Sequence, residues 1–379
     1  MDNDRIIIRD KYGHSKSVQT LQPKTAKDLM ETEIVKPDEI VKGLLPVGAS
    51  ILAGEPKCGK SFIVMQMVLA VASGMPFLGM ETQKCRVLYC DLESPNWLHQ
   101  QRLELLCNDE SSLDNIDIIT QSDREAIGTL GEGFEDQLLS YLESHMDCKL
   151  IVIDTLGEIM TSKTVDEIGN GGQYAKEKEA YDRLIALARN RQVAIVVIDH
   201  TTKTVVDKDV FRSIRGTYAT SGSYDTLMVL SIPKQEGDRQ NKRIRRLSVK
   251  GKAVAEQDIC ITLDENWEIE GASTSLQYEQ SKKERVYKSC DLAKYLKVAL
   301  SNEGKIRGSA SDILEILRAY GYIEDITPDA LGKWLMSYKT IMMDVDNVLF
   351  TKKRIASKRI MELRYGNEEA KGVTGRSVI

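Results

Sequence analysis

The chain has 379 residues, more than one ordinary hydrophobic core organises, so we expect two domains. Its content of 42% hydrophobic and 29% charged residues is normal for a soluble globular protein. No apolar run reaches the length of a membrane span, and the N-terminus lacks the apolar segment of a signal peptide. We therefore expect a cytoplasmic protein with no membrane partner.

The seven cysteines are scattered without a CxxC spacing, and there are only four histidines. We expect reduced, mostly buried thiols and no structural zinc site. The net charge of −5 hides an asymmetry, because residues 280–379 hold 19 Lys and Arg against 13 Asp and Glu, a net charge of +6. Residues 1–279 hold the other 33 and 44, a net charge of −11. An acidic body with a basic tail fits a motor attached to a nucleic-acid reader.

Residues 1–30 are polar and aperiodic, and we expect a flexible N-terminal arm. Over residues 31–272, buried-type strands alternate with helical-period segments. This pattern predicts an α/β domain with a mainly parallel sheet and helices on both faces. The predicted strands are 49–53, 85–90, 116–119, 149–154, 193–198, 226–232 and 244–249. The predicted helices are 62–72, 96–107, 134–145 and 174–191.

The stretch Gly54–Ser61, with the sequence Gly-Glu-Pro-Lys-Cys-Gly-Lys-Ser, lies between a predicted strand and a predicted helix, which is the context of a P-loop. Glycine lets backbone N–H groups approach phosphate closely, and a helix N-terminus favours an anion. We expect Lys60 to reach the terminal phosphates and the Ser61 hydroxyl to complete a Mg²⁺ shell. The expected nucleotide-binding residues are Gly54, Glu55, Pro56, Lys57, Cys58, Gly59, Lys60, Ser61 and Phe62.

Polar side chains close the predicted strands, where α/β proteins hold their ligands. Asp154 follows an apolar run and is placed to hold Mg²⁺, or else to cap the next element. Glu93 could accept a proton from the water that attacks the γ-phosphate, and Asp91 competes for that role. His200 could hydrogen-bond the γ-phosphate and report the nucleotide state, or it could simply be a packing residue.

Beyond residue 272 the pattern changes. We expect a polar linker over residues 273–285 and a small α+β domain over residues 286–379. Amphipathic segments at 291–300, 309–320 and 328–338 are followed by strand-like runs at 347–355 and 358–365, the order of a winged helix. In that arrangement the third helix faces a DNA groove and a basic wing consists of Lys352, Lys353, Arg354, Lys358 and Arg359. The wing lysines could also protect an edge strand, and the tail could bind a partner protein instead.

With these motifs placed, the first part of the chain, to about residue 270, resembles the RecA-fold ATPases. It is most similar to the plasmid RepA-type hexameric replicative helicases. The matching signatures are Gly54–Ser61, Glu93–Pro95, Asp154–Leu156, His200–Lys203 and Arg215–Thr217. The chain departs from the family at Asp199-His200, where relatives often have His-His, and in its bulkier P-loop. The extra tail looks like the layout of RepA-like ATPases of phages and integrative elements.

The resemblance implies a role for each matched residue. Lys60 and Ser61 would bind ATP and Mg²⁺, Asp154 would support the metal, Glu93 would be the catalytic base and His200 the sensor. Because these enzymes bind ATP between subunits, a neighbour supplies an arginine finger. Arg215 is the first candidate for the finger, and the rivals are Arg212, Arg243, Arg245 and Arg246.

In this fold the loops after the Asp154 and His200 strands, about 157–176 and 201–213, face the central channel. Glycines at 169, 171 and 172 would give the first loop mobility, and basic side chains would contact single-stranded DNA without reading its sequence. The expected channel contacts are Lys163, Lys203, Lys208 and Arg212.

Our leading hypothesis is an ATP-driven DNA motor, a hexameric RepA-like replicative helicase of a mobile element or phage. The alternative is a nucleotide-switched DNA-binding or loader ATPase that does not translocate. A small-molecule P-loop kinase is disfavoured, because no arginine-rich lid separates the P-loop from the Asp154 strand and because the tail is basic.

Overall fold

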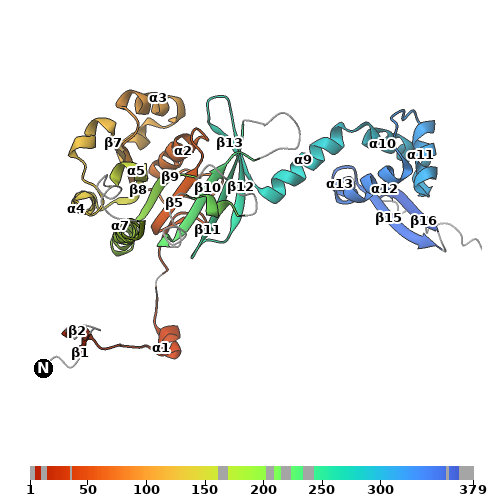
Figure 1. Ribbon diagram of the computed structural model, residues 1–379. Helices are drawn as coiled ribbons and strands as arrows, with labels where there is room; N and C mark the ends of the chain where they lie inside the picture. The colour runs from red at the N-terminus through yellow and green to blue at the C-terminus, as the bar shows by residue number, and fades with distance from the viewer. Residues whose placement is uncertain are drawn as a thin grey trace, which may run out of the picture.

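The computed structural model describes residues 5–9, 15–34, 36–160, 170–201, 209–214, 223–233, 243–355 and 358–366. In this part of the chain the largest sheet has nine strands in the order β13-β12-β11-β10-β5-β9-β8-β6-β7 (Figure 1). Its strands are β5 (Gly48–Gly54), β6 (Arg86–Asp91), β7 (Ile116–Thr120), β8 (Cys148–Asp154), β9 (Ala194–His200), β10 (Thr226–Ser231), β11 (Ile244–Gly251), β12 (Gln257–Leu263) and β13 (Ile269–Thr274). Two short strands, β3 (Glu39–Val41) and β4 (Leu45–Pro46), form a separate pair.

The sheet is mainly parallel, as the sequence predicts for an α/β domain. Neighbouring strands from β10 through β5, β9, β8 and β6 to β7 run parallel. The strands β11, β12 and β13 extend the β10 edge in antiparallel pairs, and the last two were not expected from the sequence. The carboxyl ends of the parallel strands lie together at one edge of the sheet, where a ligand can meet residues from several strands.

Helices cover both faces of the sheet and bury two hydrophobic clusters. One face packs against α2 (Lys60–Ser73), whose Val64 and Val68 are fully buried, and the other packs against α4 (Phe134–Ser144) and α7 (Asn170–Arg191). The remaining elements are α3 (Asn96–Leu106), α5 (Leu156–Ile159), η1 (Glu110–Asn115), η2 (Gln121–Ala126) and η3 (Val210–Ser213). The seven cysteines are free and five of them are buried, as expected.

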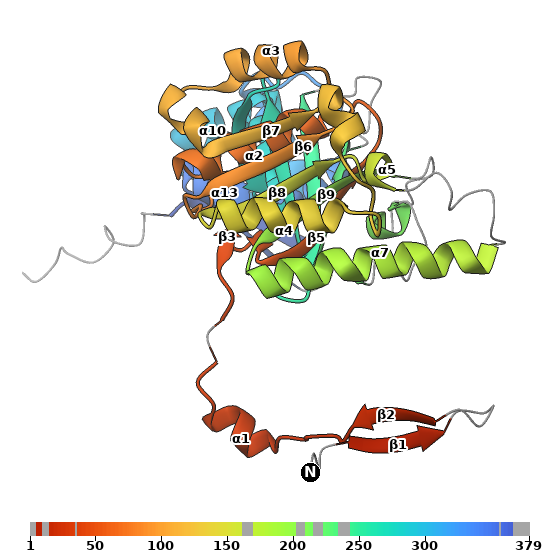
Figure 2. The ribbon, with the colours of Figure 1, turned by 90° about the vertical axis from the view of Figure 1, so that its left-hand side faces the viewer.

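The N-terminal segment differs from the aperiodic arm that the sequence suggests. The strands β1 (Arg5–Arg9) and β2 (Ser15–Gln19) form an antiparallel hairpin, and α1 (Ala26–Glu31) follows it. Thr25 and Asp28 form a capping box that begins this helix, and this short polar signal is easily overlooked in a sequence without apolar periodicity. Figures 1 and 2 show the hairpin and α1 lying away from the sheet.

Most of the segment 273–285, where we expect a polar linker, is helical in the structure. The strand β13 ends at Thr274, and α9 (Ser275–Ser289) starts directly after it. Thr274 is an N-cap: its hydroxyl accepts from Gln277 N at 3.2 Å, and the Gln277 side chain accepts from Thr274 N at 3.0 Å. A helix therefore joins the sheet to the tail (Figure 1).

The tail has its own hydrophobic core, which includes Tyr287 at the end of α9. Its elements are α10 (Asp291–Glu303), β14 (Lys305–Gly308), α11 (Ala310–Ala319), α12 (Pro328–Ser337), α13 (Lys339–Asp346), β15 (Val348–Ile355) and β16 (Lys358–Tyr365). The three helices and two strands predicted from the sequence are present, and β14 and α13 are additional. The strands form an antiparallel sheet in the order β14-β16-β15. Among the described helices of the whole chain, we find none with the length and apolar character needed to cross a bilayer.

Candidate nucleotide-binding site

The P-loop, residues 54–61, turns the chain from the end of β5 into α2. Gly54 has no room for a side chain, since a Cβ there would lie 2.7 Å from the carbonyl oxygen of Leu230. Gly59, the N-cap of α2, has a φ of 99°, which glycine adopts without strain. No side chain caps the helix there, so its first N–H groups are left for another acceptor. An uncapped 14-residue helix after a glycine turn is a suitable anion site.

Lys60 is held inside this loop. Its Nζ donates to the carbonyl oxygens of Gly54 at 2.8 Å and Glu55 at 3.1 Å, and the side chain is largely buried. His200 Nδ1 lies 3.5 Å from the same ammonium group. The structure thus places a cation and a polar ring on the concave side of the loop, where the terminal phosphates of a nucleotide would lie.

His200 reaches this position because β9 pairs with β5 in parallel, with His200 opposite Gly54. The backbone continues the pairing one step further, since Thr201 N donates to Gly54 O at 3.3 Å. A change in the conformation of the P-loop at Gly54 would therefore alter the backbone hydrogen bond at Thr201, where the loop after β9 starts.

Asp154 lies beside the P-loop on β8, which is not adjacent to β5 in the sheet. Its Oδ2 accepts from Ser61 Oγ at 3.1 Å and from the Tyr89 hydroxyl at 3.2 Å. Burial, together with the charge of neighbouring Asp91, raises the pKa of the Asp154 carboxyl to about 7. A buried carboxylate with acidic neighbours is stabilised by a nearby cation.

This donor set fits Mg²⁺ bound together with a nucleotide. The Ser61 hydroxyl and the Asp154 carboxylate are hard oxygen ligands held side by side. Among the described residues, no group of three or more His, Cys, Asp or Glu side chains converges to hold a metal ion by itself. The ion would therefore depend on phosphate oxygens and water for its other ligands, as Mg²⁺ in nucleotide sites commonly does.

Glu93 is exposed at the end of β6, and its carboxylate is held by one neighbour. Thr155 Oγ1, directly after Asp154, donates to Glu93 Oε1 at 2.8 Å. The carboxylate is thereby kept close to the end of β8 while it stays open to solvent. A solvent-accessible carboxylate beside the phosphate site is suitably placed to accept a proton from water.

Asp91, the rival for this role, is buried and fully engaged. Its Oδ1 accepts from the backbone N–H of Ser94 at 2.9 Å, and its Oδ2 lies 3.1 Å from His99 Nε2 and 3.3 Å from Arg102 Nη1. Burial raises the pKa of Asp91, but the contacts with His99 and Ser94 outweigh it and hold the pKa below its ordinary value. These contacts favour a positioning role for Asp91, since it also accepts from Glu93 N at 3.2 Å.

Sequence reasoning missed the support on the other side of the P-loop. Arg245, on β11, is buried and donates through Nε to the carbonyl oxygen of Cys58 at 2.5 Å. Its guanidinium lies 4.9 Å from the centre of the Trp267 ring, which also stacks on Phe62 at 5.4 Å. A Cβ at Gly59 would meet this ring at 2.5 Å. Buried Arg245 therefore stabilises the P-loop of its own chain. In the sequence it is marked only by its place in a cluster of arginines, which does not indicate this contact.

Several predicted residues cannot be compared with the site. Arg215, Lys163, Lys203 and Lys208 lie outside the described residues. Arg212 is exposed and pairs with Asp209 at 3.1 Å. The glycines expected to give a mobile loop are partly helical, because α7 already begins at Asn170. The helix that we predict from residue 174 therefore begins four residues earlier.

In the tail, four of the five predicted wing residues lie on a hairpin with described side chains. Lys352, Lys353, Arg354 and Arg359 are exposed on β15 and β16, whereas the side chain of Lys358 is outside the described part. They lie far along the sequence from the phosphate site, and no contact joins the two groups of residues among the described interactions.

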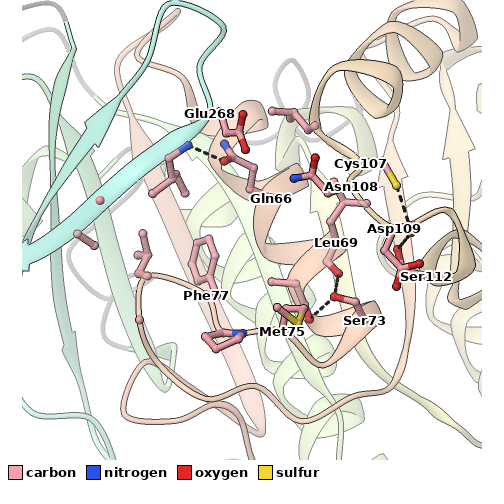
Figure 3. A pocket seen from close by; sticks show the side chains of 18 residues that line it. Gln66, Leu69, Ser73, Met75, Phe77, Cys107, Asn108, Asp109, Ser112 and Glu268 are labelled. Carbon is pink, nitrogen blue, oxygen red and sulfur yellow. Dashed lines mark hydrogen bonds between the residues drawn. The ribbon is translucent and has the colours of Figure 1, made fainter.

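A second hollow in the body lies away from the phosphate site (Figure 3). This cavity of about 400 Å³ lies between the outer side of α2, the loop after it and β13, and none of residues 54–61 lines it. Leu69 and Phe77 contribute apolar surface, and Asp109 and Glu268 contribute charge. The cavity is therefore separate from the candidate phosphate site.

The comparison with family models agrees with a nucleotide site. The family model for an AAA domain matches residues 16–205, which include the P-loop, Glu93, Asp154 and His200. A search of curated proteins gives no match. Among solved structures, the crystal structure of the RadB recombinase is 18% identical and aligns over 61% of this chain and 93% of its own length, with a TM-score of 0.40.

The position of Arg245 allows a test that separates support of the P-loop from a finger role. We expect Arg245→Ala to weaken nucleotide binding about tenfold, about 1.4 kcal/mol, because Cys58 O loses its buried partner. Titration with a fluorescent ATP analogue measures this, with Arg243→Ala, at an exposed position, as the matched control. If the Arg245→Ala variant bound nucleotide with unchanged affinity but hydrolysed ATP slowly, the support role would be contradicted and an arginine-finger role indicated.

Proposed function

The chain belongs to the AAA domain family, a family of P-loop NTPases, and on this premise we propose that it is an ATP-hydrolysing DNA motor. In the finer form of the proposal, it is a RepA-like hexameric replicative helicase of a mobile element or phage. The observation that carries hydrolysis is the meeting of Lys60, Ser61, Asp154, Glu93 and His200 at one edge of the sheet.

In this proposal each residue has one task. The N-terminus of α2 and Lys60 bind the β- and γ-phosphates, and Ser61 and Asp154 hold Mg²⁺. The ion, when bound, neutralises charge that develops on the transferred phosphoryl group. Glu93, oriented by Thr155, accepts a proton from the attacking water, and His200 contacts the γ-phosphate. Departure of that phosphate changes the contacts at His200 and so the loop after β9.

A neighbouring subunit would complete the site with an arginine. The cis contact of Arg245 with Cys58 favours the other candidates, among which we retain Arg215 first and Arg212 second. A homo-hexamer with ATP between subunits follows from the resemblance to RepA-type enzymes. Its channel would hold single-stranded DNA against the loops after β8 and β9, through Lys163, Lys203, Lys208 and Arg212.

For the tail we propose a winged-helix-like module that binds duplex DNA. A Cβ at Gly332 of α12 would lie 3.5 Å from Met361 of β16, so the helix packs directly on the hairpin. Lys333 lowers the pKa of Asp329, and the charges of Arg359 and Lys352 lower it further. The proximity of these groups supports one continuous surface formed by α12 and the wing, which suits a helix in a groove flanked by phosphate contacts.

The competing function is a loader that uses ATP as a switch and does not move along DNA. The α9 helix favours this candidate, because it joins the edge strand β13 directly to the tail and could pass a nucleotide-dependent change to it. The two candidates differ in ATP turnover and in assembly, so an ATPase assay combined with a mass measurement separates them.

We expect the Glu93→Gln variant to bind ATP with near-normal affinity. Its kcat should fall by about 100-fold or more, because proton transfer to a general base contributes to the rate on that scale. Glu265→Gln, a change of an exposed residue in the β12–β13 turn, is the matched control. The assay is steady-state ATPase with and without single-stranded DNA, alongside native mass spectrometry. Near-normal turnover of Glu93→Gln would exclude Glu93 as the base. A motor should show strong stimulation by DNA and a ring mass, whereas slow, unstimulated turnover would favour the loader.

For the tail, we expect the combined change of Lys352, Lys353 and Arg354 to Ala to weaken duplex DNA binding about tenfold. The slope of the logarithm of the binding constant against the logarithm of the salt concentration should also become less steep, by about one unit for each phosphate that a basic side chain no longer neutralises. Fluorescence anisotropy at several salt concentrations measures both effects. Lys282→Ala with Lys283→Ala, two exposed changes on α9, is the control for removal of charge. Equal effects of both variants would indicate only a non-specific charge effect and contradict a wing.

A further inference from the structure

One buried histidine has no task in the chemistry described so far. Among the described histidines His99 alone is buried, with 3% of its surface exposed, whereas His145 and His200 are half-buried. It lies on α3, the helix that begins three residues after Glu93. A polar ring that is withdrawn from water normally has a polar partner, so the neighbours of His99 indicate what it does.

The polar partner of His99 is the buried carboxylate of Asp91. His99 Nε2 lies 3.1 Å from Asp91 Oδ2, and among the described residues none hydrogen-bonds the other ring nitrogen, Nδ1. A carboxylate beside Nε2 favours a proton on that nitrogen in either charge state of the ring. The ring therefore presents an N–H group to Asp91.

The two oxygens of Asp91 serve two different segments of the chain. Oδ1 accepts from the backbone N–H groups of Glu93 at 3.2 Å and Ser94 at 2.9 Å. Oδ2 is held from α3, by His99 and by Arg102 Nη1 at 3.3 Å. Because a carboxyl group is planar and rigid, the contacts that fix Oδ2 also fix Oδ1. The helix α3 thus sets the position of the backbone turn that carries Glu93.

The same ring packs on a residue that supports Asp154. His99 meets the ring of Tyr89 edge to face, with 5.6 Å between the ring centres. Tyr89 is fully buried, and its hydroxyl donates to Asp154 Oδ2 at 3.2 Å. A side chain packed closely against its neighbours keeps one rotamer and holds them in place. His99 therefore contacts the supports of both carboxylates of the candidate site, Glu93 and Asp154.

We propose that His99 is a positioning residue for Glu93, the general base in the proposed function, on which this inference rests. The Nε2–H group of His99 holds Asp91, and Asp91 holds the backbone N–H of Glu93. Thr155 holds the other end of the same residue, at its carboxylate. With both ends fixed, the base stays within reach of the attacking water.

Two amide substitutions separate the contact with Asp91 from simple packing of the ring. The amide nitrogen of Gln corresponds in position to Nε2 of histidine, whereas that of Asn corresponds to Nδ1 and does not reach Asp91. We expect His99→Asn to lower kcat roughly tenfold while the Kd for an ATP analogue changes by less than about twofold, because the base is displaced and the phosphate site is intact. His99→Gln should hydrolyse ATP at nearly the rate of the unaltered chain.

Steady-state ATPase and titration with a fluorescent ATP analogue measure the two quantities, and thermal unfolding measures stability. His145→Asn and His145→Gln, at the half-buried end of α4, are the matched controls and should leave kcat unchanged. The His99→Asn change should slow the Glu93→Gln variant little further, because both changes act on the same step.

The outcomes distinguish this role from the proposed function itself. If Glu93→Gln hydrolyses ATP at the normal rate, Glu93 is not the base, and the proposed mechanism and this inference both fail. If Glu93→Gln is slow but His99→Asn matches the unaltered chain, only the positioning role is overturned. The role is also overturned if both amide variants lose rate or stability alike, since the ring then serves packing, or if His99→Asn slows Glu93→Gln by the full factor that it shows alone.

Discussion

The hydrogen bond from Ser61 to Asp154 is the contact on which the candidate site depends. It joins the first turn of α2 to the end of β8, although β9 lies between β8 and β5 in the sheet. Because the parallel strands end at one edge, this single contact brings the anion-binding helix end next to the carboxylates of two other strands. Burial of Asp154 makes its charged form costly without a nearby cation, and a Mg²⁺–nucleotide complex would supply one.

A second set of contacts connects the P-loop to the rest of the molecule. Arg245 on β11 donates to the P-loop carbonyl of Cys58, and Trp267, just before β13, stacks on Phe62 of α2. The strand β13 continues directly into α9. Tyr287 near the end of that helix is buried in the core of the tail. Packed elements therefore run from the P-loop through β13 and α9 to the core of the tail, and in the proposed function this is the route that would couple nucleotide state to the tail.

Much of this architecture could be predicted from the sequence, because its signals are local. Buried runs such as Leu150–Ile153 identify a central strand by composition alone, and the P-loop spacing identifies the turn. The strand β13 escapes prediction because its Ile-Glu-Gly-Ala-Ser-Thr sequence is mostly exposed and lacks an apolar period. The helix α9 does so because its polar composition resembles a linker and only the Thr274–Gln277 cap marks its start. Arg245 could not be assigned, since only the tertiary fold brings it to Cys58.

A structure of the chain with a non-hydrolysable ATP analogue and Mg²⁺ tests the central claim most directly. We predict the triphosphate on the N-terminus of α2, its γ-phosphate against Lys60 and His200, and the metal on Ser61 next to Asp154. We also predict a water molecule between the γ-phosphate and Glu93. A nucleotide bound elsewhere, or a filled P-loop with Asp154 and Glu93 turned away from it, would contradict this arrangement.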